Sequence, residues 1–199
     1  MGEKKLPIGI ESFETLAKEC YFVDKTDFIT EILDYPKTSV LLFTRPRRFG
    51  KSTTLSMVKC FFERSKEDPW EYFKLTKLSE KGRENLPEMG KYPVISLSFK
   101  NLAPTSFGQF LALLHFVMKD EYLRHIHELR EGITERSDLN YIQDLLEKDG
   151  DETKLMYSLS NLLRMLGQCY HEEVVVLIDE YDALMQEAYE GGFIDQNHY

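Results

Sequence analysis

Positive charge, long apolar runs and cysteine are all scarce in this sequence. Its 199 residues include 25 Lys and Arg against 34 Asp and Glu, for a formal net charge of −9, which argues against a general polyanion-binding surface. No segment approaches the ~18 consecutive apolar residues of a membrane span, and the N-terminus lacks the apolar core of a signal peptide. We therefore expect a cytoplasmic protein with no membrane partner.

The cysteines exclude a disulfide scaffold. Cys20, Cys60 and Cys169 lie far apart in the sequence, and an odd number cannot form a complete disulfide framework. The sequence also has no Cys-x-x-Cys pair and no histidines at the spacing of metal ligands. Reduced, buried thiols are the expectation.

Segments with helical periodicity alternate with short apolar runs along the chain. Helices are predicted over 12–19, 26–34, 51–63, 106–130, 138–148 and 152–170, with two more beginning at Asp68-Pro69 and near Asp182. Strands are predicted over 39–43, 93–99 and 174–178. The first of these is apolar on both alternating faces, as in a covered parallel strand. This alternation is typical of an α/β layered domain.

A basic segment, Thr44-Arg-Pro-Arg-Arg-Phe-Gly-Lys-Ser-Thr53, lies between a predicted strand and a predicted helix. A phosphate loop (Walker A) needs this context, because backbone N–H groups and the helix N-terminus surround phosphate oxygens. Lys51 would reach the β- and γ-phosphates, and the Ser52 hydroxyl would bind Mg²⁺. The first glycine of the usual pattern is Arg45 here. A basic turn that contains Gly-Lys-Ser by chance is the alternative.

Two carboxylates, Asp179 and Glu180, end the apolar run that begins at Val174. In phosphate-loop enzymes a carboxylate at this place (Walker B) holds the Mg²⁺ shell, and a second group orients and deprotonates water. Asp179 suits the first role and Glu180 the second. A solvated strand end is the alternative, but the preceding Gly-Lys-Ser makes the pair more specific. By fold-level analogy, Glu180 is typical of hydrolysing ATPases.

At these residues the chain resembles the bacterial and archaeal AAA-ATPase-like proteins. The matching blocks span nearly the whole chain and are Leu6-Pro-Ile-Gly-Ile10, Tyr21-Phe-Val-Asp-Lys-Thr26, Phe43-Thr-Arg-Pro-Arg-Arg-Phe-Gly-Lys-Ser52, Phe61-Phe-Glu63, Tyr92-Pro-Val-Ile95 and Leu177-Ile-Asp-Glu-Tyr-Asp182. The family tolerates a missing first glycine in the phosphate loop. The resemblance implies a phosphate-loop fold of three αβα layers with a mostly parallel sheet, and ATP and Mg²⁺ as ligands.

The resemblance also implies a set of site residues and a domain plan. Nucleotide contacts are expected from Arg47, Arg48, Phe49, Gly50, Lys51, Ser52 and Thr53, metal contacts from Ser52 and Asp179, and catalysis from Glu180. Residues 1–36 would form an N-terminal helical segment, and 37–199 the core through the Asp-Glu strand. Many family members continue into a restriction-nuclease-like domain. The class also has a further strand with a polar sensor, which is not found after Glu180. The fold is therefore expected to be incomplete at the C-terminus, and residues 1–199 alone are expected to bind nucleotide weakly or not at all and not to turn it over.

Three functions compete at this stage. The leading one is a Mg²⁺-dependent ATPase domain that drives or regulates a linked or partner domain. Assembly of the protein into a homo-oligomer is compatible with this function. The alternatives are a nucleotide-sensing module without significant turnover and a nucleic-acid-binding module built on the basic loop. Asp24-Lys25-Thr26 either caps the next helix or, as the resemblance implies, lies near the nucleotide base.

Overall fold

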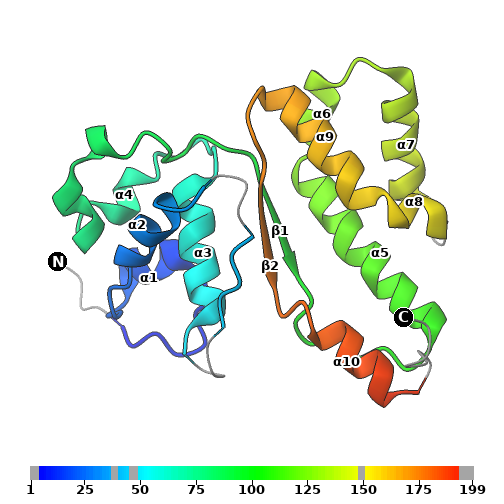
Figure 1. Ribbon diagram of the computed structural model, residues 1–199, viewed down its shortest axis with the longest axis horizontal. Coiled ribbons are helices and arrows are strands. Elements are labelled where there is room, and N and C mark those ends of the chain that lie inside the picture. Colours follow the sequence, from blue (N-terminus) through cyan, green and yellow to red (C-terminus); the bar gives the residue numbers. More distant parts are fainter. Residues whose placement is uncertain (1–4, 37–39, 45–48, 148–150, 193–199) are drawn as a thin grey trace. The chain divides into compact units, whose positions relative to one another are not determined.

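The computed structural model describes residues 5–36, 40–44, 49–147 and 151–192 (Figure 1). The chain divides into two compact units, Met1–Val94 and Ile95–Tyr199. The described residues are mixed α/β, with many helices and one two-stranded parallel sheet. The αβα fold of three layers with a mostly parallel sheet stays a prediction, as does the division into 1–36 and 37–199.

The first unit is helical. Its elements are α1 (Phe13–Glu19), α2 (Asp27–Leu33), α3 (Lys51–Phe62), α4 (Trp70–Phe73) and the short 3-10 helices η1 (Lys77–Lys81) and η2 (Arg83–Asn85). The Ser12 hydroxyl caps α1 by accepting the Thr15 N–H at 3.2 Å. The backbone N–H of Phe13, the first residue of α1, donates to the Ser56 hydroxyl at 2.9 Å and ties α1 to α3.

Three fully buried aromatic rings form the centre of this unit. The Phe73 ring from α4 lies 4.9 Å from Phe13 of α1 and 5.8 Å from Phe61 of α3, measured between centroids. None of the three side chains is more than 1% exposed. Tilted and edge-on ring pairs of this kind add to the free energy of burial. This aromatic cluster therefore sets the position of α3, the helix predicted to follow the phosphate loop.

The prediction of a strand over 39–43 is wrong for residues 40–43, the part of this range that the structure describes. Val40 is 97% exposed and Leu42 is 66% exposed, and no ladder is assigned to this stretch. An apolar run becomes a strand only where a neighbouring strand pairs with its N–H and C=O groups. In the part of the chain that the structure describes, β1 and β2 pair with each other, and Phe43 instead packs its ring 4.8 Å from Phe28. Ser39 lies outside the described residues.

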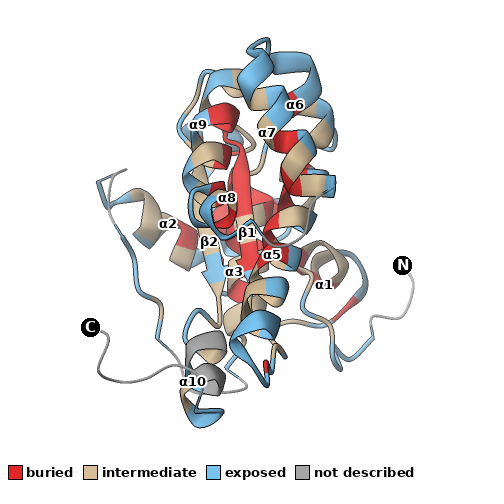
Figure 2. Ribbon diagram, turned by 90° about the vertical axis from the view of Figure 1, so that its right-hand side faces the viewer, coloured by how far each residue is buried: buried red, intermediate tan, exposed pale blue. Residues whose placement is uncertain are grey.

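The second unit places helices against the sheet. Its elements are β1 (Val94–Ser98, which begins on the last residue of the first unit), α5 (Phe107–Arg124), α6 (Ile126–Gly132), α7 (Arg136–Glu147), α8 (Glu152–Met156), α9 (Ser158–Tyr170), β2 (Val175–Asp179) and α10 (Ala183–Glu190). Buried residues gather in β1 and on the facing sides of the helices (Figure 2). The core is Ile95, Leu97, Met118, Tyr122, Leu129, Ile133, Ile142, Leu145, Leu155, Leu162, Met165 and Leu166.

Two predicted helices are each divided in two. The prediction over 106–130 meets a break at His125, where the backbone turns and the His125 N–H bonds the Tyr122 carbonyl three residues back at 3.2 Å. The prediction over 152–170 meets a similar break at Tyr157. Apolar spacing continues through both breaks, so periodicity alone could not locate them. The other predicted helices and the strands at 93–99 and 174–178 are confirmed to within a few residues. Within the described ranges, none of the helices combines the length and the apolar character that crossing a bilayer requires.

Candidate functional site

The predicted phosphate loop meets α3 at Gly50. This residue has φ 77° and ψ 33°, a left-handed conformation that glycine adopts without a steric penalty. Helix α3 begins at the next residue, Lys51. The N–H and the hydroxyl of Thr54 both donate to the Gly50 carbonyl at 2.9 Å. The turn thus leads directly into a helix N-terminus, whose first-turn N–H groups and dipole favour an anion.

The structure describes most of the predicted nucleotide contacts. Phe49 is 59% exposed, while the side chains of Lys51, Ser52 and Thr53 at the start of α3 are partly buried. Arg47 and Arg48 lie outside the described residues, together with Arg45. The local conformation at 49–54 is that of a tight turn followed by a helix, as the motif requires. Contact with a nucleotide stays a prediction.

A second lysine lies beside this turn. The Lys25 ammonium group donates to the Phe49 carbonyl at 3.0 Å. A side chain built on Gly50 would bring its Cβ to 3.4 Å from the same ammonium group. From the sequence, Asp24-Lys25-Thr26 was expected to cap the next helix or to lie near the nucleotide base. The contact between Lys25 and Phe49 was not predicted. Because the bond joins residues 24 positions apart, no local pattern could have revealed it.

The residues around Lys25 are held by a dense set of hydrogen bonds. The Asp24 carboxylate accepts the Thr26 N–H at 2.9 Å, the Thr26 hydroxyl at 2.7 Å and the Lys77 N–H at 2.7 Å. The Thr26 hydroxyl in turn accepts the Leu78 N–H at 3.1 Å. Burial raises the pKa of Asp24, but the hydrogen bonds from Thr26 and Lys77 outweigh it and leave this pKa below its ordinary value. Asp24 is thus a structural anion that ties the segment before α2 to η1.

The acidic end of the site lies in the second unit. Strand β2 ends at Asp179, whose carbonyl accepts the Phe99 N–H at 3.1 Å. Glu180 follows with φ 51°, a left-handed conformation that is costly for a residue with a side chain. Its carbonyl accepts the Ala183 N–H at 3.1 Å as α10 begins. The chain therefore makes a strained turn at the residue predicted to activate water, and both carboxylates are partly buried.

The two halves of the predicted site belong to different units. Lys51 and Ser52 are in the first, and Asp179 and Glu180 are in the second. Their meeting around one nucleotide stays a prediction. In the described ranges, no three His, Cys, Asp or Glu side chains gather so that they could hold a metal ion. A site that takes Mg²⁺ together with phosphate oxygens would need no such cluster, because Mg²⁺ in phosphate sites commonly has only one or two protein ligands.

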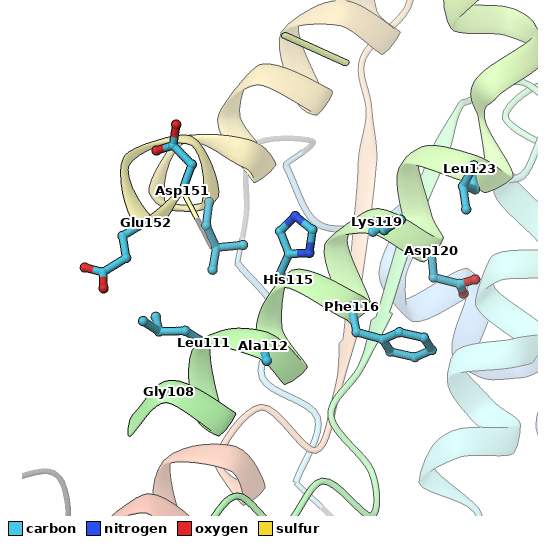
Figure 3. A pocket seen from close by; sticks show the side chains of 11 residues that line it. Gly108, Leu111, Ala112, His115, Phe116, Lys119, Asp120, Leu123, Asp151 and Glu152 are labelled. Atoms are coloured by element: carbon cyan, nitrogen blue, oxygen red, sulfur yellow. The ribbon is translucent and has the colours of Figure 1, made fainter. Parts of the chain in front are cut away.

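A hollow of about 630 Å³ lies elsewhere in the second unit (Figure 3). It is formed by α5 and the start of α8, and it is mainly apolar. The His115 ring points from α5 toward the turn that carries Asp151 and Glu152 (Figure 3). None of the predicted site residues lines this hollow. It is therefore separate from the chemistry that the motifs predict.

Comparisons with known proteins agree with the motifs. A family model described as "Predicted AAA-ATPase" (AAA-ATPase-like) matches residues 7–198. A curated relative from Azotobacter chroococcum mcd 1, described as "Uncharacterized protein in vnfD 5'region", is 25% identical over 192 residues, which cover 92% of this chain and 30% of the relative. The chain thus spans less than a third of the length of that relative. No solved structure matches significantly.

Proposed function

Because this chain belongs to the AAA-ATPase-like family, we propose that it is the ATP-binding part of a Mg²⁺-dependent ATPase. The observation that carries the proposal is the junction at Gly50, where a left-handed glycine leads into α3 at Lys51 and Ser52. A phosphate group needs this combination of a tight turn, convergent N–H groups and a helix N-terminus. The family match covers the junction and the Asp-Glu pair at the end of β2.

The residues present fit the two ligands. Backbone N–H groups at the start of α3 and the Lys51 ammonium group would bind the phosphates of ATP. The Ser52 hydroxyl and the Asp179 carboxylate are hard oxygen ligands of the kind that Mg²⁺ prefers. When bound, the metal neutralises charge on the β- and γ-phosphates. The Glu180 carboxylate would orient a water molecule toward the γ-phosphate and accept its proton.

ATP hydrolysis would drive or regulate a second domain or protein. The family resemblance points to a linked or partner domain, a nuclease-like domain among them, that ATP hydrolysis drives or regulates. The length of the curated relative is compatible with such a domain. A homo-oligomer could supply a cation to the γ-phosphate from a neighbouring subunit, as arginine fingers do in related chemistry.

Binding of Mg·ATP to the full-length protein tests the phosphate site. We expect Lys51→Ala to weaken ATP binding by about 10- to 100-fold, because a charge-assisted contact to phosphate is lost. Isothermal titration calorimetry measures this, with Lys59→Ala as the matched control. Lys59 lies on the same helix, and its ion pair is with Glu63 at 3.9 Å. Equal ATP affinity in wild type and Lys51→Ala would show that the turn at Gly50 is no phosphate site.

Turnover separates a hydrolase from a nucleotide sensor. We expect Glu180→Gln to retain ATP binding and to lose roughly 100-fold or more of the hydrolysis rate, which is the usual loss when a general base is removed. Release of phosphate at saturating ATP is the measurement. Unchanged turnover would remove Glu180 from the mechanism, and no turnover in wild type would favour the sensor. A DNA affinity that survives both variants would favour a nucleic-acid-binding module.

A further inference from the structure

Lys25 stands out because its neighbouring carboxylates are engaged elsewhere. Asp24 accepts hydrogen bonds from Thr26 and Lys77 backbone amides. Asp27 pairs with the Lys77 ammonium group at 3.2 Å. No carboxylate among the described residues forms an ion pair with Lys25. Its exposed ammonium group therefore lies beside the predicted phosphate loop, and one of its three N–H donors goes to the Phe49 carbonyl.

The position of Lys25 is built into the fold rather than left to a mobile surface chain. The next residue, Thr26, is fully buried, and its hydroxyl joins the Asp24 carboxylate to the Leu78 N–H of η1. These bonds fix the backbone on both sides of Lys25. A functional side chain that starts from a fixed backbone loses less conformational entropy when it binds a ligand.

The contact between the Lys25 ammonium group and the Phe49 carbonyl contributes little to the stability of the fold. An exposed ammonium group that donates to a carbonyl oxygen contributes little to folding, because water competes for both groups. The same ammonium group lies against Gly50, the residue at which the chain turns toward the N–H groups of α3. An anion held at those N–H groups would gain from a second positive charge close by.

We propose that Lys25 is a second phosphate-binding lysine, which contacts the phosphates of the bound nucleotide beside Lys51. This inference rests on the proposed function and adds a residue from outside the loop. In the nucleotide-free chain the ammonium group bonds the Phe49 carbonyl, and its two remaining donors are available to phosphate oxygens.

Affinity for a series of nucleotides tests this role in the full-length protein. We expect Lys25→Gln to weaken Mg·ATP binding about tenfold, in keeping with the loss of one charge-assisted hydrogen bond. ADP should be affected less, AMP little and adenosine not at all, because the loss follows the phosphates. Lys25→Arg keeps the charge and should lose less than threefold. Lys74→Gln is the control, since it removes the same charge from a lysine that pairs with Glu71 on the surface of the first unit.

Each outcome decides between the two proposals. If wild type binds ATP and Lys51→Ala weakens it but Lys25→Gln does not, the role of Lys25 is refuted and the proposed function stands. If Lys25→Gln weakens ATP and adenosine equally, Lys25 has a merely structural role and the inference fails. If wild type binds no ATP, both proposals fail. The thermal unfolding of each free variant is followed in parallel, and Lys25→Ala in the same nucleotide series provides the readout if Lys25→Gln is unfolded.

Discussion

A single buried carboxylate, Glu121 on α5, joins the sheet of the second unit to its longest described helix. The side chain is 5% exposed. One oxygen accepts the Ser96 N–H of β1 at 2.8 Å, and Arg124 donates to both oxygens at 2.6 and 3.0 Å. Burial raises the pKa of Glu121, but hydrogen bonds from His125, Arg124 and Ser96 outweigh this effect and lower its pKa to about 2. The ionised form is therefore stabilised in the folded state.

We expect Glu121→Gln to lower the free energy of unfolding by about 3 kcal/mol near pH 6, the value that follows from a pKa lowered from 4.5 to about 2. Since the folded-state pKa is depressed, this stabilisation is present above the unfolded pKa and is lost as the pH falls through about 2. The difference between wild type and variant should shrink by more than half at pH 3. Urea unfolding at both pH values measures it.

Glu131→Gln is the control for this prediction. Glu131 pairs only on the surface, with His127 at 3.3 Å, and both side chains are more than 70% exposed. Its removal should change stability by a few tenths of a kcal/mol at most, because an exposed pair of this kind contributes little. A Glu121→Gln effect that is the same at pH 6 and pH 3 would refute the linkage.

Residues of the candidate site and of the buried contact at Glu121 differ in how far the sequence predicts them. Gly50 and Lys51 belong to a contiguous motif, so their place at a tight turn and a helix start followed from spacing alone. Lys25 meets the loop through a bond across 24 positions, and Glu121 binds a strand 25 positions away. Contacts of this kind depend on how elements pack, which no local pattern encodes.

At the scale of elements, α6 and α9 approach each other closely at Gly132. A Cβ added there would lie 2.5 Å from the Cys169 sulfur, 2.9 Å from its Cβ and 3.2 Å from its Cα. The first two distances are shorter than real Cβ contacts, and the third involves backbone that cannot move alone. The small residue at 132 therefore allows the two helices to pack at this distance.

We expect Gly132→Ala to lower the free energy of unfolding by about 1–3 kcal/mol, because the added methyl group overpacks the contact with Cys169. Gly108→Ala is the matched control. Gly108 also lies in a helix, α5, and a Cβ built there meets no atom within 4 Å. That change should be neutral or stabilise by up to about 1 kcal/mol, since alanine favours helix over glycine. Urea denaturation of the three proteins compares them, and equal effects at the two sites would contradict the packing argument.

Elements were predictable where their signal is local. The helical periodicity of α3 and the apolar runs of β1 and β2 lie within short windows, and these predictions are confirmed. The run at 39–43 has the same apolar composition as β2 but is not a strand over residues 40–43. Composition predicts which runs can be strands, whereas pairing decides which of them are.

At the scale of the whole molecule, the proposed nucleotide site needs residues from both units. Ser52 lies in the first turn of α3 in the first unit, and Asp179 is the last residue of β2 in the second. Two ligands of one metal ion cannot act independently, because removal of either weakens the site on which the other depends. The family resemblance predicted that Ser52 and Asp179 act together. Sequence periodicity could not predict this, because the two residues are 127 positions apart in the sequence.

A double-mutant cycle tests the pairing in the full-length protein. We expect Ser52→Ala and Asp179→Asn each to weaken Mg·ATP binding about tenfold, and the double variant to weaken it by clearly less than the product of the two effects. The coupling should exceed ~0.5 kcal/mol, the usual limit of additivity between distant sites. With EDTA in place of Mg²⁺, both single effects should largely disappear. Additive losses that persist in EDTA would show that Ser52 and Asp179 share no metal ion, and the two units would then act on nucleotide separately.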